Sequence, residues 1–120
     1  TRIRLHGIDA PEAKQTCTAH GKEWHCGWEA TNALTNTVGE HWVTCSKRDT
    51  DRYGRVVAVC RAGHLDLNAW MVSKGWAVAY RRYSKDYVRD EAAAQSGKKG
   101  MWQGEFMMPW EWRKNEINQN

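Results

Sequence analysis

Apolar residues recur with helical spacing in some stretches of the chain and in short strand-like runs in others. Between 28 and 38, apolar or small residues fall at 30, 33, 34, 37 and 38, which is one helix face, and Gly39 is placed to end that helix. Ser84 is placed to cap a later helix. The pattern predicts strands at 1–8, 41–47, 55–61 and 76–80, a polar loop at 13–27, and helices at 28–38, 66–74 and 85–97. Strands that come first, with helices inserted and then appended, indicate an α+β domain with a small barrel.

The composition changes the picture of the core. Leu, Ile, Val and Phe make up only 16 of the 120 residues, whereas the chain has eight Trp, four Met, four Tyr and four Cys. We therefore expect one domain, at 1–113, with an aromatic and cross-linked core, followed by a polar, disordered tail at 114–120. No apolar run approaches the roughly 18 residues that span a bilayer, so no membrane partner is expected.

The four cysteines predict two disulfides. Four cysteines allow three pairings, and we favour Cys17–Cys26, which closes a polar loop, and Cys45–Cys60, which joins two strand-like segments across a hairpin. A zinc site is the alternative, but its candidate ligands have poor spacing: Cys17, His20, His25 and Cys26. Disulfides indicate a periplasmic or secreted protein.

Two segments carry the residue types that metal-assisted cleavage of a phosphodiester needs. Arg4 lies on the first predicted strand, and the turn after it brings Asp9 and Glu12 to the end of that strand. Arg55 starts a later strand, after the turn at 51–54. Guanidinium groups bind phosphate oxygens in pairs, carboxylate oxygens suit Ca²⁺ or Mg²⁺, and a further carboxylate can orient or deprotonate water. Taken singly, each segment is more typical of a surface salt bridge or a plain hairpin.

Four motifs in this order resemble the staphylococcal nuclease (thermonuclease-like) family, over residues 2–102. They are Arg4 with the run Asp9-Ala10-Pro11-Glu12, the turn Asp51-Arg52-Tyr53-Gly54-Arg55, the segment from Leu67-Asn68-Ala69 to Gly75-Trp76-Ala77, and the closing run Gly97-Lys98-Lys99-Gly100-Met101-Trp102. The Pro-Trp-Glu-Trp-Arg stretch at 109–113 and the loop between Cys17 and Cys26 lie outside the family pattern.

The resemblance implies a fold and an activity. The family has a five-stranded OB-type barrel with three helices, a common platform for nucleic acid. Its members hydrolyse DNA and RNA with Ca²⁺ and leave 3′-phosphate products, so the expected substrate is DNA, RNA or both.

The resemblance also implies roles for single residues. Asp9 would bind Ca²⁺ with help from the Ala10 carbonyl, and Glu12 would act as general base or orient the attacking water. Arg4 and Arg55 would clamp the scissile phosphate and stabilise the transition state. Three tyrosines would contact the nucleotide: Tyr53, Tyr80 and Tyr83.

The chain begins at Thr1, inside a strand-like stretch. The family places a hairpin and a second Ca²⁺-binding Asp before this point. We expect the natural protein to carry an upstream segment with that hairpin and a secretion signal. Without the hairpin, the open strand edges would favour self-association or domain swapping.

Two other classes of function remain open. A non-catalytic nucleic-acid-binding OB module is one, although such modules usually lose the arginines and carboxylates that this chain retains. A disulfide-bonded extracellular domain that binds another polyanion or a protein is the other, and the formal net charge of +4 fits it too. Salt-dependent binding of DNA separates the nucleic-acid functions from this last class.

Overall fold

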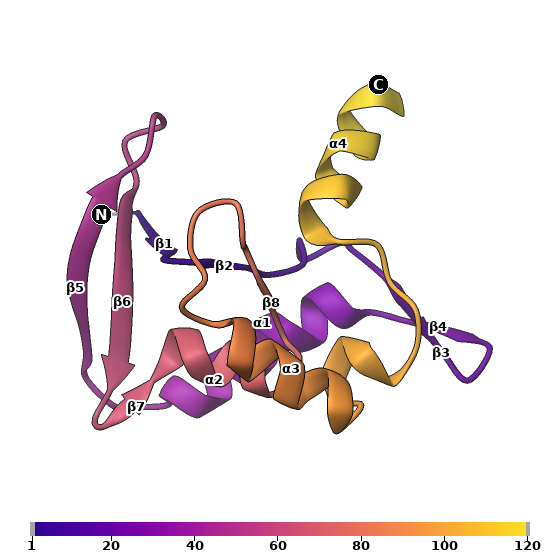
Figure 1. Ribbon diagram of the computed structural model, residues 1–120, viewed down its shortest axis with the longest axis horizontal. Helices are drawn as coiled ribbons and strands as arrows, with labels where there is room; N and C mark the ends of the chain where they lie inside the picture. The colour runs from indigo at the N-terminus through magenta and orange to yellow at the C-terminus, as the bar shows by residue number, and fades with distance from the viewer. Residues whose placement is uncertain (1, 120) are drawn as a thin grey trace.

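A computed structural model describes the backbone of residues 2–119 and the side chains of residues 2–117 (Figure 1). Its largest sheet has four strands: β1 (Ile3–Leu5), β5 (Val43–Thr50), β6 (Val56–Ala62) and β7 (Leu65–Asp66). The predicted hairpin of β5 and β6 is present, with an irregularity in register between Lys47 and Asp49. β1 lies parallel to the other side of β6, with Arg4 opposite Val57.

Two further strand pairs lie outside this sheet. β2 (Ile8–Asp9) pairs with β8 (Val78–Ala79), and β3 (Cys17–Ala19) forms a hairpin with β4 (Lys22–Trp24). The sequence predicted a loop at 13–27, which is wrong. His20 and Gly21 both have positive φ, of 54° and 77°, which allows a two-residue hairpin turn.

Four α-helices and a 3-10 turn complete the fold: α1 (Cys26–Val38), α2 (Leu67–Ser73), α3 (Val88–Ser96), η1 (Gly100–Gln103) and α4 (Pro109–Gln119). The Asp66 side chain caps α2 by accepting a hydrogen bond of 3.0 Å from the Ala69 N–H. The sequence predicted that Ser84 caps α3, which is wrong. The Ser84 hydroxyl accepts a hydrogen bond from the Asp86 N–H in the turn before the helix. α3 therefore begins at Val88.

The C-terminal end also differs from the prediction. Residues 114–119, which the sequence assigned to a disordered tail at 114–120, continue α4 to Gln119 in the structure, and residue 120 lies outside the described part of the chain. In Figure 1, α4 rises from the body of the molecule on the side opposite β5 and β6. Pro109 occupies the first helical position, where its missing N–H costs nothing.

The predicted α+β class is confirmed, but within residues 2–119 the strands form three separate sheets, and none of these sheets closes into the expected five-stranded barrel. An apolar groove of about 260 Å³ lies between the large sheet and α1, lined in part by Leu5, Leu34 and Val43. No helix among the described residues has both the length and the apolar character to cross a membrane.

Both predicted disulfides are present, Cys17–Cys26 and Cys45–Cys60, so the zinc alternative is excluded. Cys17–Cys26 joins the β3–β4 hairpin to the first residue of α1 and is buried against Val78 and Met101. Cys45–Cys60 joins directly opposed residues of β5 and β6. Each covalent link thus fastens an element of a domain that has few aliphatic residues.

The buried Asn68 side chain ties α2 to the strands that lead into the candidate site. Its amide donates to the carbonyls of His6 and Ala58, at 3.0 and 3.1 Å, and its oxygen accepts from the Cys60 N–H at 3.1 Å. The Asn68 amide thus makes three of its four possible hydrogen bonds. These bonds hold β1 and β6 in register close to β2, the strand that carries Asp9.

Candidate active site

Asp9 lies at the end of β2, and Glu12 follows three residues later, just before the turn at 13–14. Asp9 belongs to β2 and is 6% exposed. The Glu12 carbonyl accepts from the Gln15 N–H at 2.8 Å, and a Cβ on Gly27 of α1 would overlap that same carbonyl oxygen. Only glycine at position 27 therefore lets α1 pack this close to the backbone of Glu12.

A guanidinium from the far end of the chain bridges the two carboxylates. Arg113 of α4 donates to Asp9 Oδ2 at 2.6 Å and to Glu12 Oε1 at 3.1 Å. The Asp9 side chain is 7% exposed, Arg113 34% and Glu12 46%, so the cluster runs from the interior to solvent. Charge-assisted hydrogen bonds of this length hold all three side chains in a defined arrangement.

Burial and charge oppose each other at Asp9. Burial raises the pKa of Asp9 above its ordinary value of 3.8, and the hydrogen bond and charge of Arg113, with the charge of Arg4, only partly offset it. For Arg113, burial acts to lower the pKa, but the hydrogen bonds and charges of Asp9 and Glu12 outweigh it and the pKa rises. The arginine is therefore a permanent cation between two acids.

The segment before α4 is fastened to the β3–β4 hairpin, which explains how Arg113 reaches the site. Thr18 and Glu105 exchange two backbone hydrogen bonds of 2.8 and 2.7 Å, and the buried Gln15 amide donates to the Met107 carbonyl at 2.7 Å. A Cβ on Gly104 would overlap the Thr18 carbonyl oxygen. Because Cys17–Cys26 anchors the same hairpin, this disulfide contributes to the placement of α4.

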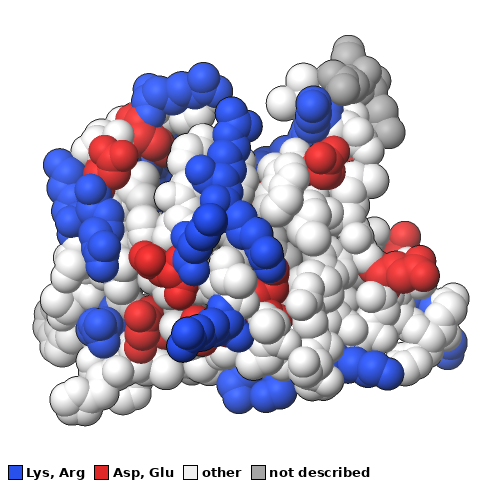
Figure 2. Space-filling view, in the orientation of Figure 1, with Lys and Arg blue, Asp and Glu red and all other residues white. Residues whose placement is uncertain are grey.

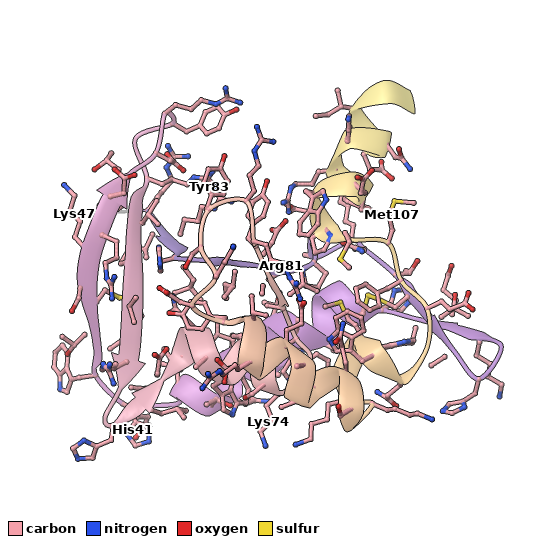
Figure 3. All side chains as sticks on the ribbon, in the orientation of Figure 1. His41, Lys47, Lys74, Arg81, Tyr83 and Met107 are labelled. Atoms are coloured by element: carbon pink, nitrogen blue, oxygen red, sulfur yellow. A yellow bond between two sulfur atoms is a disulfide. The ribbon has the colours of Figure 1, made fainter. Side chains whose placement is uncertain are left out.

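Arg4 lies among aromatic rings beside this cluster. Its guanidinium carbon is 5.6 Å from the centre of the Tyr80 ring and 5.7 Å from that of Tyr83, within the range of a cation–π contact. Tyr83 is exposed on the loop between β8 and α3 (Figure 3). The Tyr80 ring stacks on Trp110 of α4, with centroids 4.9 Å apart and an interplanar angle of 5°. Trp110 and Arg113 share one face of α4, since they are three residues apart.

Arg55 is held separately, by its own turn. Its Nε donates to Asp51 Oδ2 at 2.7 Å, and Asp51 Oδ1 accepts from the backbone N–H groups of Tyr53 and Arg55, each at 2.9 Å. Burial acts to raise the pKa of Asp51, but these hydrogen bonds, the backbone N–H of Arg55 first, lower it below 3.8. The Arg55 guanidinium lies 5.5 Å from the centre of the exposed Tyr53 ring.

The predicted site residues thus fall into two groups. The first contains Asp9, Ala10 and Glu12 with Arg4, Tyr80 and Tyr83, and the second contains Tyr53 and Arg55. Within residues 2–117, no side-chain hydrogen bond or ion pair joins Arg55 to Arg4, Asp9 or Glu12.

Sequence reasoning missed Arg113 and Trp110, which were interpreted as part of a packing tail. One signal was available: Pro109, followed by the acidic Glu111, is compatible with the first turn of a helix. Nothing local indicated that this helix would contact Asp9, 104 residues earlier.

Comparison with known proteins identifies the family. The family model described as "Staphylococcal nuclease homologue" matches residues 2–104 of this chain. The chain belongs to this family. The match ends before α4, so Trp110 and Arg113 lie outside the part that the family model covers.

Several curated proteins are similar over nearly the whole chain. A probable staphylococcal-like nuclease of rice, CAN1, is 37% identical over 98% of this chain and 34% of its own length. An uncharacterized endonuclease of Escherichia coli is 36% identical over 93% of this chain and 70% of its own length. Protein ParB of Escherichia coli is 31% identical over 98% of this chain and 69% of its own length. The chain spans about a third of the length of the rice proteins it matches.

Proposed function

We propose that this protein is a nuclease that hydrolyses phosphodiester bonds of DNA or RNA. The observation that carries the proposal is the cluster of Asp9 and Glu12 with a guanidinium between them, next to Arg4 on an aromatic surface. Two acids, fixed cations and stacking rings are what binding and cleavage of a phosphodiester require. Family membership and relatives named as nucleases support the same function.

Arg4 and Arg55 are proposed to bind the phosphate. Arg55 is held by Asp51 in a turn that leaves its guanidinium only half-buried, so its remaining N–H groups are available to an oxygen anion. Arg4 keeps its charge over the tyrosine rings and makes no hydrogen bond to an acid within residues 2–117. Two such donors, fixed before the substrate arrives, stabilise the charge that develops on the phosphate in the transition state.

Glu12 is proposed to orient or deprotonate the attacking water. It is the more exposed of the two acids, and its backbone is fixed by Gln15 and by the close approach of Gly27. The water oxygen bonds to phosphorus and its proton passes to Glu12, while the bond from phosphorus to the 5′ oxygen breaks and that oxygen takes a proton from solvent to become a 5′-hydroxyl. The phosphate then stays on the 3′ oxygen, as the family resemblance implies.

A divalent cation is proposed to bind the two acids through the oxygens that Arg113 does not contact. The guanidinium of Arg113 occupies the place between the acids and contacts Asp9 Oδ2 and Glu12 Oε1, which leaves Asp9 Oδ1 and Glu12 Oε2 for the cation. Asp9, Glu12 and the Ala10 carbonyl are hard oxygen donors, which suit Ca²⁺; within the described residues no group of three or more acidic, His or Cys side chains gathers as a metal site. Ca²⁺ bound here would supply positive charge to the phosphate and to the attacking water.

Tyr53, Tyr80 and Tyr83 are proposed to contact the nucleic acid. All three lie beside an arginine, and Tyr53 and Tyr83 are more than half exposed. Rings next to cations bind the bases and phosphates of a single strand with little dependence on sequence. The two disulfides indicate that the protein works in an oxidising compartment, and we propose the periplasm or the extracellular medium.

Hydrolysis of single-stranded DNA with Ca²⁺ and then with a Ca²⁺ chelator tests the proposal. Cleavage that requires Ca²⁺ and leaves 3′-phosphate ends, identified by mass spectrometry, is the expected result. Salt-dependent binding without cleavage under either condition would indicate either a binding module or a nuclease that needs the expected upstream strands, and cleavage by a chain that carries those strands would decide between the two. An absence of both would exclude a function on nucleic acid.

A further inference from the structure

A cavity of about 440 Å³ opens beside the candidate active site, between the end of β8 and the segment that leads into α4. Its volume is within the range of roughly 300–1,000 Å³ found for small-molecule sites. The lining comes from three separated parts of the chain: Tyr80 and Arg82 after β8, Gln95 on α3, and Trp102, Met108 and Trp110 near the C-terminus. Two of these, Met108 and Trp110, lie beyond the part of the chain that the family model matches.

The walls of this cavity suit a flat aromatic ligand. Tyr80 and Trp110 are held parallel by their own stacking contact, and Trp102 is fixed edge-on to Phe106, with centroids 4.8 Å apart. Met108 adds a polarisable apolar surface. Rings that already have fixed orientations lose little conformational entropy when a base stacks against them.

The cavity is continuous with the site that holds the carboxylates. Tyr80 lines it and also contacts Arg4, which we place on the scissile phosphate. Trp110 lines it from the same face of α4 that delivers Arg113 to Asp9 and Glu12. The Tyr80 ring therefore lies between the cavity and Arg4, next to the place that we assign to the phosphate.

The charge around the opening also favours a nucleotide. Arg82 is exposed at the rim beside Arg81, whose charge is paired with Glu91, and Figure 2 shows Lys and Arg side chains gathered over the middle of this face, above the loop between β8 and α3. The acid in the lining, Glu91, is already bonded to the Ala79 N–H at 2.7 Å and to Arg81 at 2.9 Å. Because its charge is paired, it does not oppose an approaching phosphate. Arg81 lies at the centre of this region in Figure 3.

We infer that this cavity is a base subsite: it takes one nucleobase of a single-stranded substrate next to the bond that is cut. The inference rests on the proposed nuclease function. A base in a duplex is stacked and paired, and would have to leave the helix to enter the cavity. The subsite therefore makes single-stranded DNA or RNA the preferred substrate.

An octathymidylate with one abasic nucleotide, moved through each position in turn, tests the subsite. For the parent protein, each cut is expected to slow about tenfold when the abasic nucleotide occupies one particular position relative to it, because one stacked base is lost. Abasic nucleotides at distant positions are expected to have little effect.

Two tryptophan variants on α3 make this test specific. Gln95 is exposed on α3 and lines the cavity, so Gln95→Trp fills it, whereas Ala93→Trp adds the same ring at an exposed position of α3 outside it. The position-specific effect is expected to disappear in Gln95→Trp and to remain in Ala93→Trp. Equal sensitivity in both variants, or none in the parent protein, would overturn the subsite.

Hydrolysis of bis(4-nitrophenyl) phosphate, a diester without a base, separates failure of the subsite from failure of the nuclease proposal. Cleavage of this probe without any position-specific effect of the abasic nucleotide leaves the nuclease standing and removes the subsite. If no diester is cleaved, binding of the intact and abasic octamers in chelator decides, by fluorescence anisotropy. The subsite is supported if one abasic octamer binds the parent protein more weakly than the intact octamer and this difference disappears in Gln95→Trp. Equal binding of all octamers to the parent protein overturns it.

Discussion

The two halves of the candidate site are positioned over very different distances along the chain. Arg55 is held by Asp51, four residues before it, within one turn. Asp9 and Glu12 are held by Arg113, which is 104 and 101 residues away and reaches them through α4. The first half therefore depends on its own hairpin alone, whereas the second depends on everything that fastens α4 to the domain.

The difference teaches where the site is robust. The Asp51–Arg55 turn depends on the Asp51 side chain and on the pairing of β5 with β6, and the Cys45–Cys60 disulfide links those strands directly. The cluster at Asp9 requires the β3–β4 hairpin, its disulfide, the bridge from Thr18 to Glu105 and the start of α4. Variants in the two halves should accordingly fail in different ways.

The largest expected effect comes from removing the local half. Arg55→Ala is expected to lower the rate of DNA hydrolysis by roughly 10²–10³-fold with the fold intact, because one preorganised donor to the transition state is lost. Rates with Ca²⁺ and circular dichroism spectra measure the two quantities. Arg52→Ala is the matched control, since Arg52 lies in the same turn and, within residues 2–117, its guanidinium bonds to the Tyr53 hydroxyl and to no acid. Equal rates for Arg55→Ala and the parent protein would remove Arg55 from the site.

Variants of Arg113, in the long-range half, are expected to lose only part of the activity. Arg113→Ala should lower activity by about 10–100-fold, the usual cost of losing a residue that orients catalytic groups. Arg113→Lys should recover only part of it, because an ammonium lacks the planar fork that reaches both carboxylates. Lys114→Ala, one residue along α4 and exposed, is the control for the helix itself. A higher rate in Arg113→Ala would contradict this role and identify the arginine as an inhibitory plug.

The two disulfides sharpen the same comparison through stability. Replacing either pair by serines should cost about 3 kcal/mol in the free energy of unfolding, measured with guanidinium, since the closed loops are of similar size. At guanidinium concentrations too low to unfold the protein, loss of Cys17–Cys26 should also reduce activity, because α4 is fastened to the β3–β4 hairpin. Loss of Cys45–Cys60 should reduce activity less. The reverse order of activities would refute the proposed link between the hairpin and α4.

The smallest expected effects are those of pH on two aspartates. The pKa of Asp9 is raised on folding, so its ionised form costs stability above that pKa and costs nothing below 3.8. Asp9→Asn should therefore stabilise the protein at neutral pH, with no difference near pH 3, while activity is lost. The pKa of Asp51 is lowered, so Asp51→Asn should destabilise at neutral pH, an effect that fades as the pH falls through the folded pKa. Thermal unfolding across this pH range measures both, and changes of the same sign would contradict the opposite directions.

Sequence reasoning reached the parts of this molecule that are built from neighbours. The turn at 51–55, the hairpin of β5 and β6 and both disulfide pairings follow from residues close in sequence. The β3–β4 hairpin was missed because its turn, His20-Gly21, is an uncommon pair for two positive φ angles. α4 was missed because polar residues at 114–120 resemble a disordered tail, and its contacts are made by one face near its start.

The pairing of Asp9 with Arg113 has a consequence for how the protein is made. A ribosome produces the two carboxylates early and the bridging arginine 104 residues later. Until α4 has been synthesised and docked, a nascent chain holds two acids with no counter-charge between them and an incomplete aromatic wall. A site built in this order is complete only after Arg113 has left the ribosome and α4 has docked on the rest of the domain.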